Sequence, residues 1–256
     1  ASFATPVSQS FYARVGTGPV ELDSFALLRP VADSTPVVSL TGRTTLSSGG
    51  HSAFPGATRL RDGRIIAVWR QGGGHNALDG TVRASWSSDG GATWTDDREV
   101  LAVDGSDVRD PSLWVADDGS LMMAVYYKNS STGFIRGVRL HRSTDGGQSW
   151  GTGVVLPTGY SGASVGNPPV KVGERWVLPL YAFSSSRSTR FSAYVATSTD
   201  GITFGTPQLV LDGDAQGVAA AEPGLDVLKN GTLVMTMRQT SQWAVSTDQG
   251  RTWVLR

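Results

Sequence analysis

Two acidic residues of this chain each stand directly before a proline, Asp110 in Arg109-Asp110-Pro111 and Glu222 in Glu222-Pro223. Two carboxyl groups that face one another can cleave a glycosidic bond, one as the acid and the other as nucleophile or base. Their separation decides whether the sugar retains or inverts its configuration. Asp110 and Glu222 are therefore candidate catalytic residues, although Asp110 has a simpler interpretation as an ion-pair partner of Arg109.

These proline pairs belong to a repeated element. Phe54-Pro55 and Asn167-Pro168 complete a set of four, and an apolar stretch, a polar turn and a second apolar stretch follow each pair. The second stretches cover residues 65–69, 121–125, 176–180 and 233–237. They are short and bounded by turn residues, which favours buried strands over helices. Asp62-Gly63, Asp118-Gly119 and Asn230-Gly231 are typical of tight hairpins, so the predicted structure is β nearly throughout.

A second pattern recurs in phase with the first. Residues 87–94 read Ser-Ser-Asp-Gly-Gly-Ala-Thr-Trp, and related copies occupy residues 143–150, 198–204 and 246–253. Their aspartates lie 56, 55 and 48 positions apart. A unit of this length holding four antiparallel strands, repeated around an axis, is a β-propeller blade, whereas solenoid repeats are usually shorter or helical.

The blade count follows from this period. We predict four blades over residues 51–256. Residues 1–50 contain further strand-like pieces at 10–15, 25–28 and 37–40, which would form a fifth blade closed by Trp253-Val254-Leu255. The prediction is an all-β, five-bladed propeller, with a six-bladed or an incomplete ring as the alternatives.

Composition excludes several classes of function. The chain has 256 residues with 22 basic and 22 acidic side chains, and this balance argues against a nucleic-acid partner. The absence of cysteine excludes disulfides, thiolate nucleophiles and cysteine-ligated metals, and we expect no metal site and no cofactor. No apolar run approaches the roughly 20 residues that span a bilayer, so we expect no membrane insertion. The first residues contain no visible signal peptide.

The recurring aspartate turn resembles the Asp-box of the sialidase-like (BNR repeat) β-propellers, and the resemblance covers roughly residues 44–256. In physical terms the box is a fastener: its Asp and Ser side chains accept hydrogen bonds from the turn, glycine permits positive φ, and tryptophan packs into the blade. The resemblance implies that the boxes lie away from the active site. We therefore assign no chemistry to Asp89, Asp145, Asp200 and Asp248.

The resemblance also implies that the chemistry lies near the propeller axis, at one end of the inner strands. The residues before the four prolines would then ring the mouth, together with the residues that end the neighbouring strands, which are Arg70, Tyr126, Tyr181 and Arg238. With Arg109, these four side chains are the candidate substrate-binding residues. Their flat aromatic faces and charges are a mixture that can hold sugars.

Sialidases use three arginines that clamp the substrate carboxylate, a tyrosine–glutamate nucleophile and an aspartate acid/base. The stretch from Glu222 to Arg238 resembles the part of the family that carries the glutamate and the second arginine. The first arginine is absent, because Phe54 stands in its place, and the third arginine and the tyrosine nucleophile belong to later blades than those in this sequence. Asp79 is a candidate acid/base, with a plain Asp-Gly turn as the alternative. His75 beside it is a candidate binding residue or a solvated loop residue.

We expect from this a propeller that engages glycans at its central rim, as a non-catalytic or divergent recognition module of the surface or phage-tail type. The alternative is a glycoside hydrolase, either exo-sialidase-like or a two-carboxylate enzyme using Asp110 and Glu222. A purely structural propeller is a third possibility. The expected partner is a carbohydrate, with sialylated and other acidic glycans among the candidates, and an extracellular or virion-associated location within a larger assembly is the matching expectation.

Overall fold

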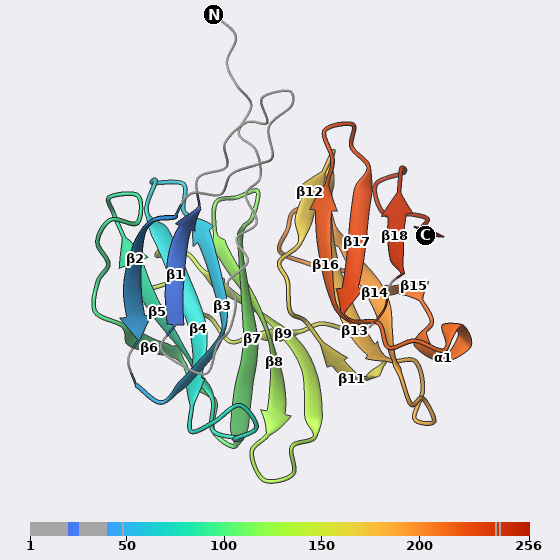
Figure 1. Cartoon of the computed structure of the whole chain (residues 1–256), viewed down its shortest axis with the longest axis horizontal. Coiled ribbons are helices and arrows are strands. Elements are labelled where there is room, and N and C mark those ends of the chain that lie inside the picture. The colour runs from blue at the N-terminus through green and yellow to red at the C-terminus, as the bar shows by residue number, and fades with distance from the viewer. Residues whose placement is uncertain (1–19, 26–39, 48, 239, 241) are drawn as a thin grey trace, which may run out of the picture.

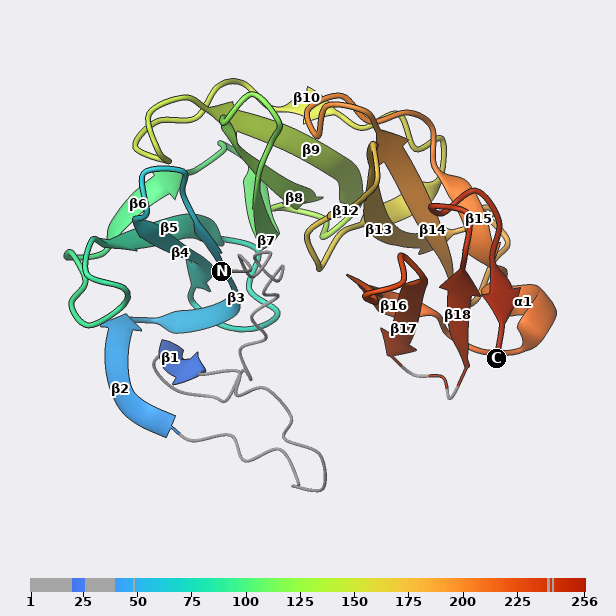
Figure 2. The same cartoon turned by 90° about the horizontal axis from the view of Figure 1, so that it is seen from above.

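The computed structural model describes residues 20–25, 40–47, 49–238, 240 and 242–256. Apart from the short helix α1 (Gly213–Gln216), every regular element in this part of the chain is a strand. Four antiparallel sheets follow one another around a common axis and form the blades of a β-propeller (Figure 1, Figure 2). The predicted all-β propeller of antiparallel blades is confirmed, with four complete blades among the described residues.

Each blade runs from an inner strand near the axis to an outer strand at the rim (Figure 2). Blade 1 consists of β3 (His51–Arg59), β4 (Ile65–Gly72), β5 (Thr81–Ser87) and β6 (Arg98–Leu101). Blade 2 consists of β7 (Ser106–Val115), β8 (Leu121–Asn129), β9 (Ile135–Ser143) and β10 (Val154–Val155).

The inner strand of blade 3 is divided into two pieces. Both β11 (Ser161–Ser164) and β12 (Val170–Val172) pair with β13 (Arg175–Phe183), and β14 (Phe191–Ser198) and β15 (Gln208–Leu211) follow. Blade 4 consists of β16 (Ala221–Val227), β17 (Leu233–Arg238), β18 (Trp243–Ser246) and β19 (Val254–Leu255).

The prediction of a fifth blade closed by the C-terminal strand is wrong. Val254 and Leu255 pair with Val245 and Ala244, so β19 is the outer strand of blade 4. The N-terminal stretch contributes a two-stranded sheet of β1 (Val20–Phe25) and β2 (Leu40–Ser47). The strand predicted at 10–15 lies outside the described residues, as do residues 26–28 and 37–39 of the other two predicted pieces.

The hydrophobic core lies between neighbouring blades. One cluster joins blades 1 and 2 through residues such as Val68, Trp86 and Met123, and further clusters join blade 2 to blade 3 and blade 3 to blade 4. Strands buried on both faces read as continuous apolar runs, which is why the sequence could be divided into blades before the structure was known.

The four Asp-boxes have the fastener geometry. In blade 1, Asp89 accepts hydrogen bonds from the Ser87 hydroxyl (2.8 Å), the Thr93 amide (2.9 Å) and the Thr93 hydroxyl (2.6 Å). These bonds favour the carboxylate and hold the pKa of Asp89 at about 2. Asp145 and Asp248 repeat the pattern, and Asp200 keeps the serine and amide bonds in its shorter copy.

The boxes also fasten each blade to its neighbour. The Trp86 indole donates to the carbonyl of Gly146 (2.8 Å) in the box of blade 2, and the Trp114 indole donates to the carbonyl of Gly201 (2.7 Å) in the box of blade 3. Gly147 has a φ of 87°, and a Cβ there would lie 2.5 Å from the Ile66 side chain. Glycine is therefore required at this box position by conformation and by contact.

Blade 4 differs from the other blades in burial. The strands β8 and β13 are buried along most of their length, whereas β17 alternates, with Leu233, Met235 and Met237 buried and Thr236 and Arg238 exposed. One face of blade 4 thus packs on blade 3, and the opposite face is accessible.

Candidate functional site

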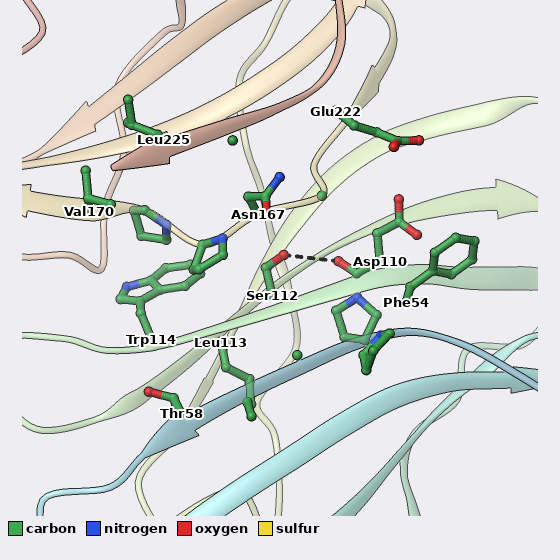
Figure 3. A pocket seen from close by; sticks show the side chains of 18 of the residues that line it. Phe54, Thr58, Asp110, Ser112, Leu113, Trp114, Asn167, Val170, Glu222 and Leu225 are labelled. Atoms are coloured by element: carbon green, nitrogen blue, oxygen red, sulfur yellow. Dashed lines mark hydrogen bonds between the residues drawn. The ribbon is translucent and has the colours of Figure 1, made fainter. Parts of the chain in front are cut away.

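A cavity of about 810 Å³ lies on the propeller axis, between the inner strands of the four blades (Figure 3). One part of it is polar and contains Asp110, Asn167 and Glu222, whereas Leu113, Trp114, Val170 and Leu225 line the apolar part. Because neighbouring strands within a blade are antiparallel, the Asp-boxes lie at the end of the blade where the inner strands β7 and β16 finish, away from the end at which these strands begin.

The same unusual backbone occurs at one position in three blades. Phe54, Asp110 and Glu222 have φ values of 54°, 52° and 47°, in the left-handed region that residues with side chains rarely occupy. At each of them the inner strand has a register shift typical of a β-bulge. A bulge re-aims a side chain, and here all three residues line the cavity. Strained backbone of this kind clusters at functional sites.

Blade 3 departs from this pattern. The residue opposite Tyr181 is Ser164, and Asn167-Pro168 follows in the connection between β11 and β12. Asn167 therefore does not occupy the bulge position that the sequence comparison of the four proline pairs predicts. It still lines the cavity, and its side-chain amide donates to the carbonyl of Pro223 (3.0 Å).

Asp110 is a buried carboxyl group that forms no ion pair with any of the described residues. Its residue is 7% exposed, and Oδ1 has no hydrogen-bond partner. Burial, and next the negative charge of Glu222, raise the pKa of Asp110 from its ordinary value of 3.8 to about 8. Asp110 therefore holds a proton at neutral pH and can donate it to a molecule in the cavity.

Glu222 has a different environment at the equivalent position. Its Oε1 forms an ion pair with Nη2 of Arg238 (2.7 Å), and the two side chains are 39% and 57% exposed. Figure 3 shows the Glu222 carboxylate on the same side of the cavity as the Asp110 carboxyl and the Phe54 ring. The site thus brings together a protonated acid and an ion-paired carboxylate.

Two of the predicted binding residues are buried tyrosines beside Asp110. Tyr126 stands opposite Arg109 across β7 and β8, and Tyr181 stands opposite Ser164. Burial, and then the charge of Asp110, raise the pKa of both phenols far above their usual range. Both hydroxyls therefore keep their protons, and each can act only as a neutral hydrogen-bonding group.

Arg70 and Arg109 serve a buried ion cluster whose centre the sequence analysis missed. The Asp107 side chain is fully buried and accepts hydrogen bonds from Arg70 Nε (2.8 Å), the Gly80 amide (2.9 Å) and Arg109 Nε. Arg70 also donates to the carbonyls of Gly74 and Ala77, and Arg109 donates to those of His75 and Ala77. The signal in the sequence was the i, i+2 spacing of Asp107 and Arg109, which puts both on one face of a strand.

His75 and Asp79 lie in the loop that follows β4. The His75 ring packs against His51 (5.7 Å between ring centres) and Phe54 (5.5 Å), and burial lowers its pKa, with the charge of Arg109 adding to the effect. Asp79 accepts hydrogen bonds from the Gly73 amide and is 59% exposed. Neither residue is among those that line the cavity.

Within the ranges given above, no group of three His, Asp or Glu side chains is placed to hold a metal ion. No helix in the same ranges has the length and apolar character needed to cross a membrane.

Comparison with known proteins gives a family and a set of similar folds. The family model of the BNR repeat-like domain matches residues 63–255. No curated protein matches the chain in sequence. A solved protein of unknown function from Dyadobacter fermentans is 21% identical, with a TM-score of 0.67, over 80% of this chain and 68% of that one.

Two glycosidases are among the other similar structures. A Hadza microbial sialidase is 17% identical with a TM-score of 0.68, and the match covers 88% of this chain and 51% of the sialidase. An α-L-arabinofuranosidase of Fusarium graminearum, solved with arabinobiose, is 15% identical with a TM-score of 0.60, over 84% of this chain and 69% of that one. At these identities the likeness is one of fold, and the chain spans about half the length of the sialidase.

Proposed function

We propose that this chain, which belongs to the family of BNR repeat-like domains, binds a glycan in its central cavity and hydrolyses a glycosidic bond there with Asp110 and Glu222. The observation that carries the proposal is the contrast between the two carboxyl groups. One is buried, unpaired and protonated at neutral pH, and the other is held beside an arginine. Two titratable groups whose environments differ in this way match the acid and base roles of a glycosidase.

The hydrolysis assigns a step to each residue. Asp110 gives its proton to the glycosidic oxygen as the bond from that oxygen to the anomeric carbon breaks, so the leaving group departs as a neutral alcohol. Glu222 either attacks the anomeric carbon or removes a proton from the attacking water. Water supplies the new hydroxyl group, and its remaining proton restores Asp110 directly or by way of Glu222.

Arg238 in the cavity and two tyrosines buried beside Asp110 support this chemistry. Arg238 lies 2.7 Å from Oε1 of Glu222 and can hold that side chain in place for either role. Tyr126 and Tyr181 surround Asp110 with neutral phenols, so they offer hydrogen bonds without adding charge. The similar folds include a sialidase and an arabinofuranosidase solved with arabinobiose, which supports a glycan as the ligand.

Hydrolysis of a panel of fluorogenic aryl glycosides tests the proposal. Asp110→Asn and Glu222→Gln should each reduce kcat by about 10²- to 10⁴-fold, the usual contribution of a positioned acid or base. Glu174→Gln is the matched control, because Glu174 is an exposed carboxylate in the turn between β12 and β13 and should leave kcat unchanged. The rate should also fall above about pH 8, where Asp110 loses its proton.

Two results would overturn the catalytic assignment. Turnover that survives both substitutions would place the chemistry elsewhere. Glycan binding without turnover of any glycoside would leave a recognition module, which is the other function that the rim residues suit.

A further inference from the structure

Among the described residues, the cavity has no basic side chain without an acidic partner to offer a negatively charged sugar. Of the described residues that line the cavity, Arg238 and Lys171 are the basic ones, and each already has an acidic partner. Arg238 is paired with Glu222 at 2.7 Å, and Lys171 Nζ lies 2.6 Å from Asp117. A ligand carboxylate here would also be repelled by the like charge of Glu222.

The two arginines nearest to Asp110 do not change this conclusion. The side chains of Arg70 and Arg109 are 0% and 4% exposed, both pair with Asp107, and Arg70 also lies 3.7 Å from Asp79, so two carboxylates oppose the two guanidinium charges. Their remaining described hydrogen bonds go to backbone carbonyls of the loop after β4. Lys128, opposite Asp107 in the sheet, does not line the cavity.

Phe54 occupies the bulge position that carries carboxyl groups in blades 2 and 4. A bulky residue with a φ of 54° is a backbone outlier, so the surrounding contacts must hold it in this conformation. The ring is held in place by His75 on one side and by the Arg109 guanidinium, 5.7 Å from the ring centre. Figure 3 shows it next to the Asp110 carboxyl.

We propose that the cavity selects a neutral glycosyl unit, whose apolar C–H face stacks on Phe54, over a sugar that carries a carboxylate. The inference rests on the proposed role of the cavity as a glycan site and names its substrate class. Rigid aromatic rings provide large apolar contact area at low entropic cost, and a few polar groups then fix the orientation of the ligand. Phe54 acts here as a specificity residue that touches the bound sugar.

A glycan array that pairs neutral glycans with their sialylated and uronic-acid counterparts tests the selectivity. The wild-type protein should bind neutral members at least about tenfold more tightly than acidic ones, which corresponds to about 1.4 kcal/mol. Preferential binding of the acidic members, or no binding to any glycan, would overturn the inference. Binding of neutral glycans without hydrolysis would refute the catalytic proposal and leave this one standing.

Three variants at one position separate a stacking role from a structural one. Phe54→Tyr keeps the ring and should keep the affinity, whereas Phe54→Leu removes the ring and should weaken binding of neutral glycans by about tenfold. Phe54→Arg supplies a cation and should shift the neutral-to-acidic binding ratio toward acidic glycans. If all three variants lost affinity equally for neutral and for acidic glycans, Phe54 would have a merely structural role. Thermal unfolding of each variant verifies that it is folded.

Discussion

Blades 2 and 4 present a carboxyl group from the same strained backbone position, yet the two groups have different properties. Asp110 in blade 2 is buried and protonated, and Glu222 in blade 4 is partly exposed and ion-paired. The backbone cannot be the cause, because the φ angles differ by only 5°. The cause is the surroundings, since blade 2 is covered on both sides by other blades and one face of blade 4 is accessible.

This comparison shows that equivalent positions of a repeated fold can carry two carboxyl groups with different properties, although the local backbone conformation is the same. Desolvation alone raises the pKa of a carboxyl group, and an adjacent arginine opposes such a rise. The position of a blade in the ring therefore decides how strongly the side chain at its bulge is desolvated. The residue type at the bulge decides whether that side chain is a carboxyl group at all.

The largest expected effect concerns the ion cluster that supports blade 2. Replacing Asp107 by alanine would leave the buried Arg109 without its acidic partner and Arg70 with only the longer contact to Asp79, so the free energy of unfolding should fall by about 3–5 kcal/mol. Urea denaturation measures this difference. A loss below about 1 kcal/mol would mean that the cluster is hydrated and that blade 2 is less enclosed than its burial indicates.

The second prediction concerns the pH dependence of stability. Between about pH 4 and pH 8 the folded protein holds a proton on Asp110 that the unfolded chain releases, so the free energy of unfolding should decrease as the pH rises through this window. Asp110→Asn removes this contribution, and the stability of the variant relative to wild type should increase from pH 5 to pH 8. Urea titrations at several pH values provide the measurement, and a difference that is independent of pH would contradict the raised pKa.

The coupling between the two blades gives a third, smaller effect. Because the charge of Glu222 contributes to the raised pKa of Asp110, Glu222→Gln should lower that pKa, while burial keeps it well above 3.8. Carboxyl carbon NMR of the variant reports the titration of Asp110. An unchanged midpoint would show that the two groups are not electrostatically coupled.

The smallest effect belongs to the ion pair of blade 4. Arg238→Ala removes a pair between partly exposed side chains, and such pairs contribute at most about 1 kcal/mol. Thermal unfolding should therefore change little, in contrast to the Asp107 variant. A loss as large as that of Asp107→Ala would abolish the distinction between the enclosed and the accessible blade.

Much of the fold could be predicted from the sequence, because its signals are local and repeated. The boxes around Asp89, Asp145 and Asp248 and the hairpin glycines each need only a few neighbouring residues to form their turns. The periodic placement of proline pairs was enough to find Asp110 and Glu222. The family resemblance and the short final strand did not determine the number of blades, because the sequence of that strand does not encode whether Val254 pairs with nearby Val245, as it does, or with a distant N-terminal strand.

The rest of the site depends on contacts that sequence spacing does not encode. Arg70 and Arg109 have residue types suited to a substrate clamp, but their partner Asp107 is revealed only when β4 and β7 come together. Asn167 illustrates another limit, because its proline pair looks equivalent to the others while the two extra residues after Ser164 place it in a connection. The protonation of Asp110 likewise follows from packing and not from its neighbours in the chain.

The bulge that carries Phe54, Asp110 and Glu222 has a consequence for evolution. The positive φ, the register shift and the proline that follows are shared by all three positions, whereas the side chains are an aromatic ring and two acids of different length. A single codon change at one of them can thus alter what the cavity recognises or catalyses while the Asp-boxes and the inter-blade core stay intact. Substitutions at these three positions can therefore change the specificity of the cavity in different combinations, and the variants along the way remain folded.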